Sequence, residues 1–170
     1  MPLTLLLGGA GSGKSSLAVR RAAAWEGPVL VVATAEAGDE EMAARIERHR
    51  AARPEAWRTV EEPLDLRGAL GSAADEAFVI VDCLTLWTAN ALEAGWSDEE
   101  TVAAAAETAG LAAARRSPTL VVSNEVGLGL VPQAPLGRRY RDVHARVNAL
   151  FAAAAGQAYL VIAGRTLELS

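Results

Sequence analysis

Short apolar runs alternate along the chain with longer Ala-rich or amphipathic stretches. The apolar runs are rich in Val, Leu and Ile without polar alternation, which is typical of strands buried on both faces of a sheet. They predict strands at Leu3–Leu7, Val29–Ala33, Phe78–Val81, Leu120–Ser123 and Tyr159–Ala163. The stretches between them predict helices at Lys14–Trp25, Asp39–Arg50, Leu64–Gly71, Leu84–Ala94, Asp98–Arg116 and Arg138–Ala155. Ser97 followed by Glu100 resembles a capping box at the start of one helix.

This alternation of strands and helices predicts an α/β fold, a mostly parallel sheet with helices on both faces. A chain of 170 residues without a repeat or linker fits a single domain over 1–170. No apolar run approaches the roughly 18 residues of a membrane span, and the N-terminus has no signal-peptide pattern. A single cysteine, Cys83, excludes an internal disulfide and argues against a zinc site. With a net charge of −5, we expect a cytoplasmic protein that does not bind nucleic acid.

Residues 8–15 form the most specific local pattern, since they follow an expected strand and lead into an expected helix. They are Gly8, Gly9, Ala10, Gly11, Ser12, Gly13, Lys14 and Ser15, which is the G-x-x-x-x-G-K-[ST] pattern of a P-loop. The backbone N–H groups of such a loop converge on phosphate oxygens. Lys14, the only lysine of the chain, is expected to reach the β- and γ-phosphates, and Ser15 to ligate Mg²⁺. We interpret the chain as a nucleotide-binding protein.

Asp82 follows the strand expected at Phe78–Val81. An acidic residue at the end of a buried strand is the usual second metal-holding group of a P-loop protein. Asp82 could also cap the helix expected from Leu84, and both roles are compatible. The Gly- and Pro-containing segment Asn124–Gly137 follows another strand, at the edge of a parallel sheet where ligands bind. We expect it to be a functional loop rather than a simple connection.

The region 39–62 concentrates arginines around one of the two histidines, His49. These arginines are Arg45, Arg48, Arg50, Arg53 and Arg58. Met42 and Ile46 lie on one helical face, and His49 is next in line on it. One interpretation of this spacing is a basic helix end exposed to solvent, with a histidine whose hydrogen bonds are satisfied.

A functional interpretation of the same region is a phosphate-facing cluster, because arginine forks match phosphate oxygens. Neighbouring cations favour neutral imidazole, which is nucleophilic and could attack a phosphorus atom held by those arginines. The other histidine, His144, lies in an expected helix without such a cluster, and we expect it to be structural or exposed.

Together, the P-loop, the region around His49 and the segment that begins at Asn124 resemble the adenosylcobinamide kinase / adenosylcobinamide-phosphate guanylyltransferase family. Members of this family are bifunctional enzymes of cobalamin biosynthesis. The resemblance covers nearly the whole chain. It rests on residues 8–15, Asp39–Met42 with Arg45, Ile46 and His49, Arg53 with Pro54, Trp57–Thr59, Glu61, Asp82–Thr85 with Asn90, Asn124–Gly129 with Val131 and Pro132, and Arg141, Asp142 and Arg146–Asn148. The P-loop alone is unspecific, whereas the blocks around His49 and Asn124 are specific.

The resemblance implies a P-loop nucleotide hydrolase-like fold, a homotrimer and two reactions. The first phosphorylates the aminopropanol hydroxyl group of adenosylcobinamide with ATP or GTP. The second transfers GMP from GTP to adenosylcobinamide phosphate through a covalent GMP–histidine, and the matching residue is His49. Lys14 is the second catalytic candidate, and Mg²⁺ would lie on Ser15 and Asp82. The implied nucleotide contacts are Gly8–Ser15, Ala33, Thr34, Ala35, Arg50, Ala51, Ala52, Arg53, Glu61 and Asp82.

Three alternatives stay open at this point. Glu125 either orients the incoming hydroxyl group or a metal-bound water, or only anchors its own loop. The protein could be a simple P-loop small-molecule kinase without nucleotidyl transfer, in which His49 is structural. It could also be a nucleotide-dependent binding or switch protein with little chemistry of its own.

Overall fold

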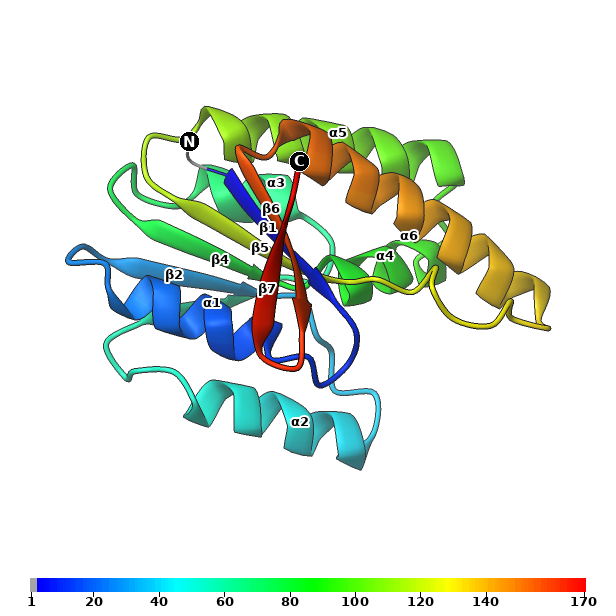
Figure 1. The fold of residues 1–170 in the computed structure, drawn as a ribbon, viewed down its shortest axis with the longest axis horizontal. Coiled ribbons are helices and arrows are strands. Elements are labelled where there is room, and N and C mark those ends of the chain that lie inside the picture. The colour runs from blue at the N-terminus through cyan, green and yellow to red at the C-terminus, as the bar shows by residue number, and fades with distance from the viewer. Residues whose placement is uncertain (1–2) are drawn as a thin grey trace.

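A computed structural model describes residues 3–170, except the side chain of Arg45. Figure 1 shows a central sheet with helices on either side of it. In chain order the elements are β1 (Leu3–Gly8), α1 (Lys14–Ala23), β2 (Val29–Ala33), α2 (Glu40–Ala51), β3 (Arg58–Glu61), α3 (Leu66–Gly71), β4 (Phe78–Asp82), α4 (Leu84–Glu93), α5 (Asp98–Ala114), β5 (Thr119–Asn124), α6 (Pro135–Ala154), β6 (Gln157–Ile162) and β7 (Arg165–Leu169).

The strands form one seven-stranded sheet in the order β3-β2-β4-β5-β1-β6-β7. All neighbouring pairs are parallel except β6 and β7. The expected α/β fold with a mostly parallel sheet is therefore confirmed. Because β5 lies between β1 and β4, the carboxyl ends of these three strands meet at one edge of the sheet. This edge is where an open parallel sheet binds ligands.

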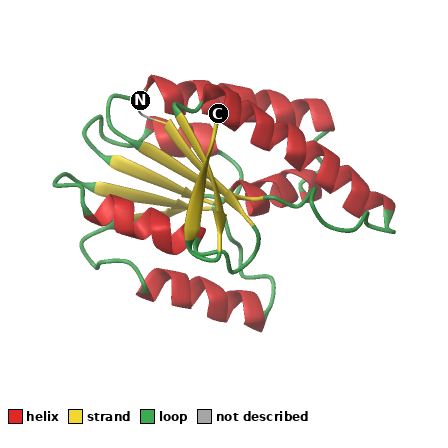
Figure 2. Cartoon of the chain, viewed as in Figure 1, coloured by secondary structure: helices red, strands yellow, loops and turns green. Residues whose placement is uncertain are grey.

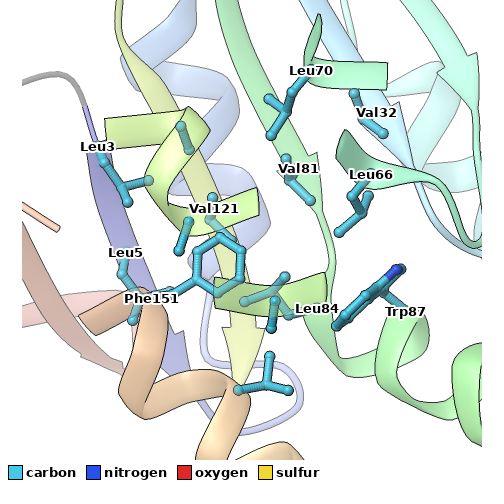
Figure 3. Close-up of a cluster of buried hydrophobic side chains, with 14 of the residues drawn as sticks. Leu3, Leu5, Val32, Leu66, Leu70, Val81, Leu84, Trp87, Val121 and Phe151 are labelled. Carbon is cyan, nitrogen blue, oxygen red and sulfur yellow. The ribbon is translucent and has the colours of Figure 1, made fainter. Parts of the chain in front are cut away.

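Both faces of the sheet are covered by helices, as Figure 2 makes clear. On one face, Ala18 and Ala22 of α1 pack against strand residues such as Val31 and Ile80. On the other face, α3 to α6 cover a larger cluster, part of which Figure 3 draws around Leu84. Strand residues alternate between these two clusters, so the central strands are buried on both sides. This double burial explains their continuous apolar runs.

Helix α2 packs less deeply than its neighbours, and in Figure 1 it lies on the outer side of α1. None of its described side chains is fully buried, although Met42, Ile46 and His49 are half-buried. Its N-cap is Asp39, whose side chain accepts a hydrogen bond from the Met42 N–H group. The capping box expected at Ser97 and Glu100 is present at the start of α5. No helix within residues 3–170 is both long enough and apolar enough to cross a membrane.

Neither edge strand, β3 or β7, was predicted from the sequence. Their sequences, Arg-Thr-Val-Glu and Arg-Thr-Leu-Glu-Leu, carry no continuous apolar run. Every residue of β7 is exposed, and none of β3 is buried, so neither strand needs an apolar sequence. The strand expected at Tyr159–Ala163 instead begins at Gln157 and ends at Ile162. It ends there because Ala163 and Gly164 form the turn into β7, and both have positive φ, 50° and 76°.

We expect Ala163→Asn to stabilise the protein. A left-handed conformation costs an ordinary L-residue roughly 1–2 kcal/mol, and asparagine tolerates it better than alanine. Asn-Gly is also the preferred pair for a two-residue hairpin turn. The free energy of unfolding, measured by urea denaturation, should rise by about 0.5–1 kcal/mol. Ala163→Val, which cannot adopt this conformation without strain, should lower it, and a loss of stability in the asparagine variant would contradict this account.

Candidate functional site

The P-loop joins the end of β1 to the start of α1. Gly11 and Gly13 have φ values of 70° and 94°, which favour glycine. Gly8 is needed for a different reason, because a Cβ atom there would lie 2.5 Å from the backbone oxygen of Val161. Gly13 is the N-cap of α1 and no side chain caps this helix. The first N–H groups of α1 are therefore available to an anion, as in other anion sites at helix N-termini.

Lys14 and Ser12 have polar atoms inside this loop. Lys14 is only 8% exposed, and its Nζ atom donates a hydrogen bond to the Gly9 carbonyl at 2.8 Å. The ammonium group is therefore held over the loop. The buried Ser12 Oγ atom has no hydrogen-bond partner among the described residues, as expected for a group that serves a ligand. The turn between β6 and β7 braces the loop, since Gly164 N–H donates to the Ser12 carbonyl at 2.9 Å.

Asp82 is the last residue of β4 and faces the start of α1. Ser15 Oγ lies 3.5 Å from Asp82 Oδ1, so the two expected metal ligands lie side by side. Burial raises the pKa of the Asp82 carboxyl group, but the hydrogen bond and charge of His49, with the charges of Arg53 and Lys14, hold this pKa below its usual value. The carboxylate is therefore charged. The alternative role as a helix cap is wrong, because Cys83 occupies the N-cap position of α4 and makes no capping bond.

His49 reaches the same carboxylate from α2. Its Nδ1 atom lies 3.3 Å from Asp82 Oδ2, and Arg53 Nη2 lies 3.5 Å from that same oxygen. The expected helical face is confirmed, since Met42, Ile46 and His49 line one pocket. The interpretation as a solvated basic helix end holds for Arg48 and Arg50, which are exposed in the last turn of α2. It does not hold for Arg53, which follows the helix and has a side chain that is only 10% exposed.

The arginines around His49 do not form the single phosphate-facing cluster that the sequence predicted. Arg50 points to the surface and pairs with Glu61 and Glu47, at 3.2 and 3.5 Å. Arg48 is exposed, in contrast to the half-buried Arg53. The charged group that contacts the imidazole is a carboxylate, that of Asp82, and this contact was not expected from the sequence.

The pocket lies at the carboxyl edge of the sheet, between the strand ends and α2. Its lining residues are Lys14, Ser15, Ala33, Ala35, Met42, Ile46, His49, Arg50, Arg53, Thr59, Glu61, Asp82, Cys83, Leu86, Val122 and Asn124. The P-loop lysine and the candidate nucleophile therefore share one pocket. A second hollow shares Ser15 and His49 with this pocket and is also lined by Ala52, which follows Ala51 at the end of α2. The mixture of apolar and charged residues suits a ligand with a flat ring and phosphate groups.

The sequence of the chain matches the family described as cobinamide kinase / cobinamide phosphate guanyltransferase over residues 4–169. The chain belongs to this family. A "Bifunctional adenosylcobalamin biosynthesis protein CobP" from Pseudomonas aeruginosa is 43% identical over 97% of this chain and 95% of its own. The CobU proteins of the same description from Escherichia coli and Salmonella typhimurium are 39% and 40% identical, each over 95% of this chain and 96% of their own.

Solved structures of low sequence identity share the fold of this cobinamide kinase family member. A protein from Pyrococcus horikoshii OT3 superimposes with a TM-score of 0.60 at 9% identity, over 98% of this chain and 85% of its own. An ATPase of the type III secretion system of pathogenic bacteria gives a TM-score of 0.53 at 11% identity, over 94% of this chain and 50% of its own. Both likenesses concern the fold alone.

One implied nucleotide contact of this family member, Thr34, does not offer its side chain to the pocket. Thr34 is fully buried, and its hydroxyl group donates to the Cys83 carbonyl at 2.7 Å, so its side chain serves the fold. The flanking Ala33 and Ala35 do line the pocket. Burial and the charge of Asp82 raise the pKa of the Cys83 thiol. Cys83 therefore lines the pocket as an uncharged thiol.

Sequence reasoning gave no role to several residues that line the pocket. Thr59 lies on the missed strand β3, while Leu86 and Val122 lie on α4 and β5. Asn124 begins the segment that was expected to be functional because it follows a strand, but it received no role of its own.

The structure bears on two further residues beyond β5. Glu125 Oε1 accepts a hydrogen bond from the Gly127 N–H group, which favours the role of anchoring its own loop. This loop is shorter than expected, because α6 begins at Pro135 rather than Arg138. His144 is fully buried and hydrogen-bonded, so the alternative of an exposed histidine is wrong.

Proposed function

We propose that this chain catalyses both reactions named in its family, on one pocket. It phosphorylates the aminopropanol hydroxyl group of adenosylcobinamide with ATP or GTP. It then transfers GMP from GTP to adenosylcobinamide phosphate and yields adenosylcobinamide-GDP. The observation that carries the proposal is that Lys14 of a P-loop and His49 of α2 line the same pocket. In a simple kinase this histidine would serve only as a partner of the Asp82 carboxylate.

In the kinase reaction the P-loop positions the donor. The acceptor oxygen attacks the γ-phosphorus atom, the bond to the bridging oxygen breaks, and the nucleoside diphosphate leaves while the hydroxyl proton is lost to solvent. Lys14 stabilises the charge that spreads over the phosphate oxygens. Its burial favours this role, because a charge interacts more strongly in a pocket of low polarity than in water.

Ser15 and Asp82 are proposed to hold Mg²⁺. A hydroxyl and a carboxylate oxygen lie 3.5 Å apart beside the P-loop, and the carboxylate is charged. Magnesium is usually held by one or two such groups together with substrate phosphates and waters. When bound, Mg²⁺ neutralises charge on the phosphate oxygens.

His49 is proposed as the nucleophile of the transferase reaction. An unprotonated imidazole nitrogen attacks the α-phosphorus atom of GTP, a P–N bond forms, and pyrophosphate leaves. A phosphate oxygen of adenosylcobinamide phosphate then attacks the same phosphorus atom, and the P–N bond breaks. Asp82, at 3.3 Å from Nδ1, orients the imidazole ring and can stabilise its positive charge in the transition state.

The remaining nucleotide contacts are proposed to be Gly8–Ser15, Ala33–Ala35, Arg50–Arg53 and Glu61. We further propose that residues 1–170 act as one catalytic domain, in the cytoplasm, as a homotrimer. Two groups of exposed apolar side chains support an interface between subunits, Leu128, Leu130 and Val131 after β5, and Ile162, Leu167 and Leu169 on β6 and β7.

Labelling with GTP tests the proposed function directly. The enzyme is incubated with Mg²⁺ and GTP labelled at either the α- or the γ-phosphorus atom. We expect covalent label from the α position only, stable to base and labile to acid, and its release upon addition of adenosylcobinamide phosphate. Consumption of ATP only with an alcohol acceptor, without an adduct, would identify a simple kinase. Nucleotide binding without either reaction would identify a switch protein.

A further inference from the structure

Asn124 occupies a central place in the pocket but has no part in the reactions described above. It is the last residue of β5, the strand between the P-loop strand β1 and the Asp82 strand β4. In register it pairs with Gly8, and Val122 pairs with Asp82. Asn124 thus lies beside the start of the P-loop and lines the pocket with Lys14.

The backbone of Asn124 is held from both sides by other parts of the protein. Its N–H group donates to Thr85 Oγ1 of α4 at 2.8 Å. Its carbonyl oxygen accepts two hydrogen bonds from α6, from His144 Nε2 and Asn148 Nδ2, both at 3.0 Å. Since both backbone groups are occupied, the side-chain amide is what Asn124 can offer to a ligand.

The two donors on α6 are themselves oriented by a buried network. Because a carbonyl oxygen only accepts, the hydrogen of the neutral His144 ring lies on Nε2. Nδ1 then faces Thr88 Oγ1 at 3.0 Å. Ser123 Oγ donates to Asn148 Oδ1 at 2.6 Å, which turns the amide nitrogen of Asn148 towards Asn124.

The environment of His144 keeps its ring uncharged while it donates to the Asn124 carbonyl. Burial lowers the pKa of His144, against the opposite effects of the Asn124 carbonyl and the charge of Glu125. The ring of Tyr140 stacks on His144 at 5.5 Å between centroids, with an interplanar angle of 8°. A buried polar network is costly unless all its groups are satisfied, and apolar residues would pack as well. Here the network converges on one backbone carbonyl at the pocket, as expected of groups that support a functional residue.

We propose that the Asn124 amide donates a hydrogen bond to the γ-phosphate of the bound nucleoside triphosphate, and that His144 and Asn148 are positioning residues that act through it. Lys14 approaches the phosphates from the P-loop, and Ser15 with Asp82 marks the metal side. Asn124 lies at the end of β5, the strand between β1, which leads into the P-loop, and β4, which ends at Asp82. It gives up no proton during phosphoryl transfer, and keeps its bond to a non-bridging oxygen while the bridging bond breaks. The kinase role rests on the proposed function, whereas the γ-phosphate contact does not.

Nucleotide binding to the full chain tests this contact without a corrinoid. We compare by calorimetry, with Mg²⁺, the affinities for the β,γ-imido analogue of ATP and for ADP. Asn124→Ala should weaken analogue binding about tenfold, the scale of a hydrogen bond to a charged group, and leave ADP binding unchanged. Gln133→Ala, which removes an exposed amide from the segment between β5 and α6, should change neither affinity. An unchanged ratio of the two affinities in Asn124→Ala would overturn the proposal.

Phosphoryl transfer tests the positioning residues. His144→Leu removes the donor to the Asn124 carbonyl, whereas His144→Gln keeps an amide donor near Nε2. We expect His144→Leu to lower kcat about tenfold with little change in KM, and His144→Gln to recover most of it. His144→Leu should have no further effect in an Asn124→Ala background, because it acts through that residue. Additive losses in the folded variants would instead identify a purely structural histidine.

The γ-phosphate contact and the proposed function can be contradicted separately. If the wild type does not act on adenosylcobinamide but Asn124→Ala still loses its preference for the triphosphate analogue, the proposed function is wrong and the γ-phosphate contact stands. If the wild type performs both reactions and Asn124→Ala matches it in kcat and in both affinities, the contact is wrong and the function stands. The Asn124 variants remain informative even if His144→Leu fails to fold, because the Asn124 side chain is no part of the buried network.

Discussion

Lys14→Ala should lower kcat of both reactions by about 10²–10³-fold, which corresponds to roughly 3–4 kcal/mol of lost transition-state stabilisation. Lys14 Nζ is already held over the loop, 2.8 Å from the Gly9 carbonyl, so its charge stands at the phosphate site before the nucleotide arrives. Both reactions use the same cradle, so both rates should fall together. Phosphorylation of adenosylcobinamide and formation of the GMP adduct are measured separately, at saturating nucleotide.

Arg67→Ala is a control for the loss of a positive charge. Arg67 pairs with Glu107 at 2.7 Å on an exposed surface, where an ion pair contributes only about 0–1 kcal/mol, and it lies outside the pocket. This variant should keep both activities. Thermal unfolding of Lys14→Ala verifies that the variant is folded. Wild-type rates in a folded Lys14→Ala variant would remove the P-loop from the mechanism.

His49→Ala should abolish the GMP adduct and leave most of the kinase activity. The kinase reaction needs the P-loop and the pair of Ser15 and Asp82, which do not include the imidazole. Asp82 loses one partner in this variant but keeps Arg53 at 3.5 Å, so we expect the kinase rate to fall by less than about tenfold. Adduct formation is followed with GTP labelled at the α-phosphorus atom, and the kinase reaction with ATP.

Glu41→Ala tests whether any change in α2 has the same effect. Glu41 is exposed in the first turn of the helix and does not line the pocket, so this variant should form the adduct normally. Equal loss of both activities in a folded His49→Ala variant would indicate a binding or structural role for the histidine. Persistence of the adduct would place the covalent bond on another residue.

The central strands were predictable because they are buried on both faces. β2 and β4 are almost continuous apolar runs, and such a pattern has few other uses in a protein of this size. The edge strands β3 and β7 were not predictable, because an exposed strand is specified by its neighbour's backbone rather than by apolar side chains. The early start of α6 at Pro135 fits the preference of proline for the first turn of a helix, which the expectation of a loop up to Gly137 overlooked.

The sequence by itself determined the phosphate cradle, because a P-loop is a local structure whose glycines, lysine and serine are neighbours in the chain. It also indicated His49 and Asp82 one at a time, from a helical face and a strand end. Only the tertiary structure decided that Asp82 Oδ1 faces Ser15 while Oδ2 faces His49 and Arg53. The same holds for the bonds from α6 to the Asn124 carbonyl. Contacts of this kind join residues far apart in the chain, and their geometry depends on the strand order and on how α2 and α6 pack, which no local pattern encodes.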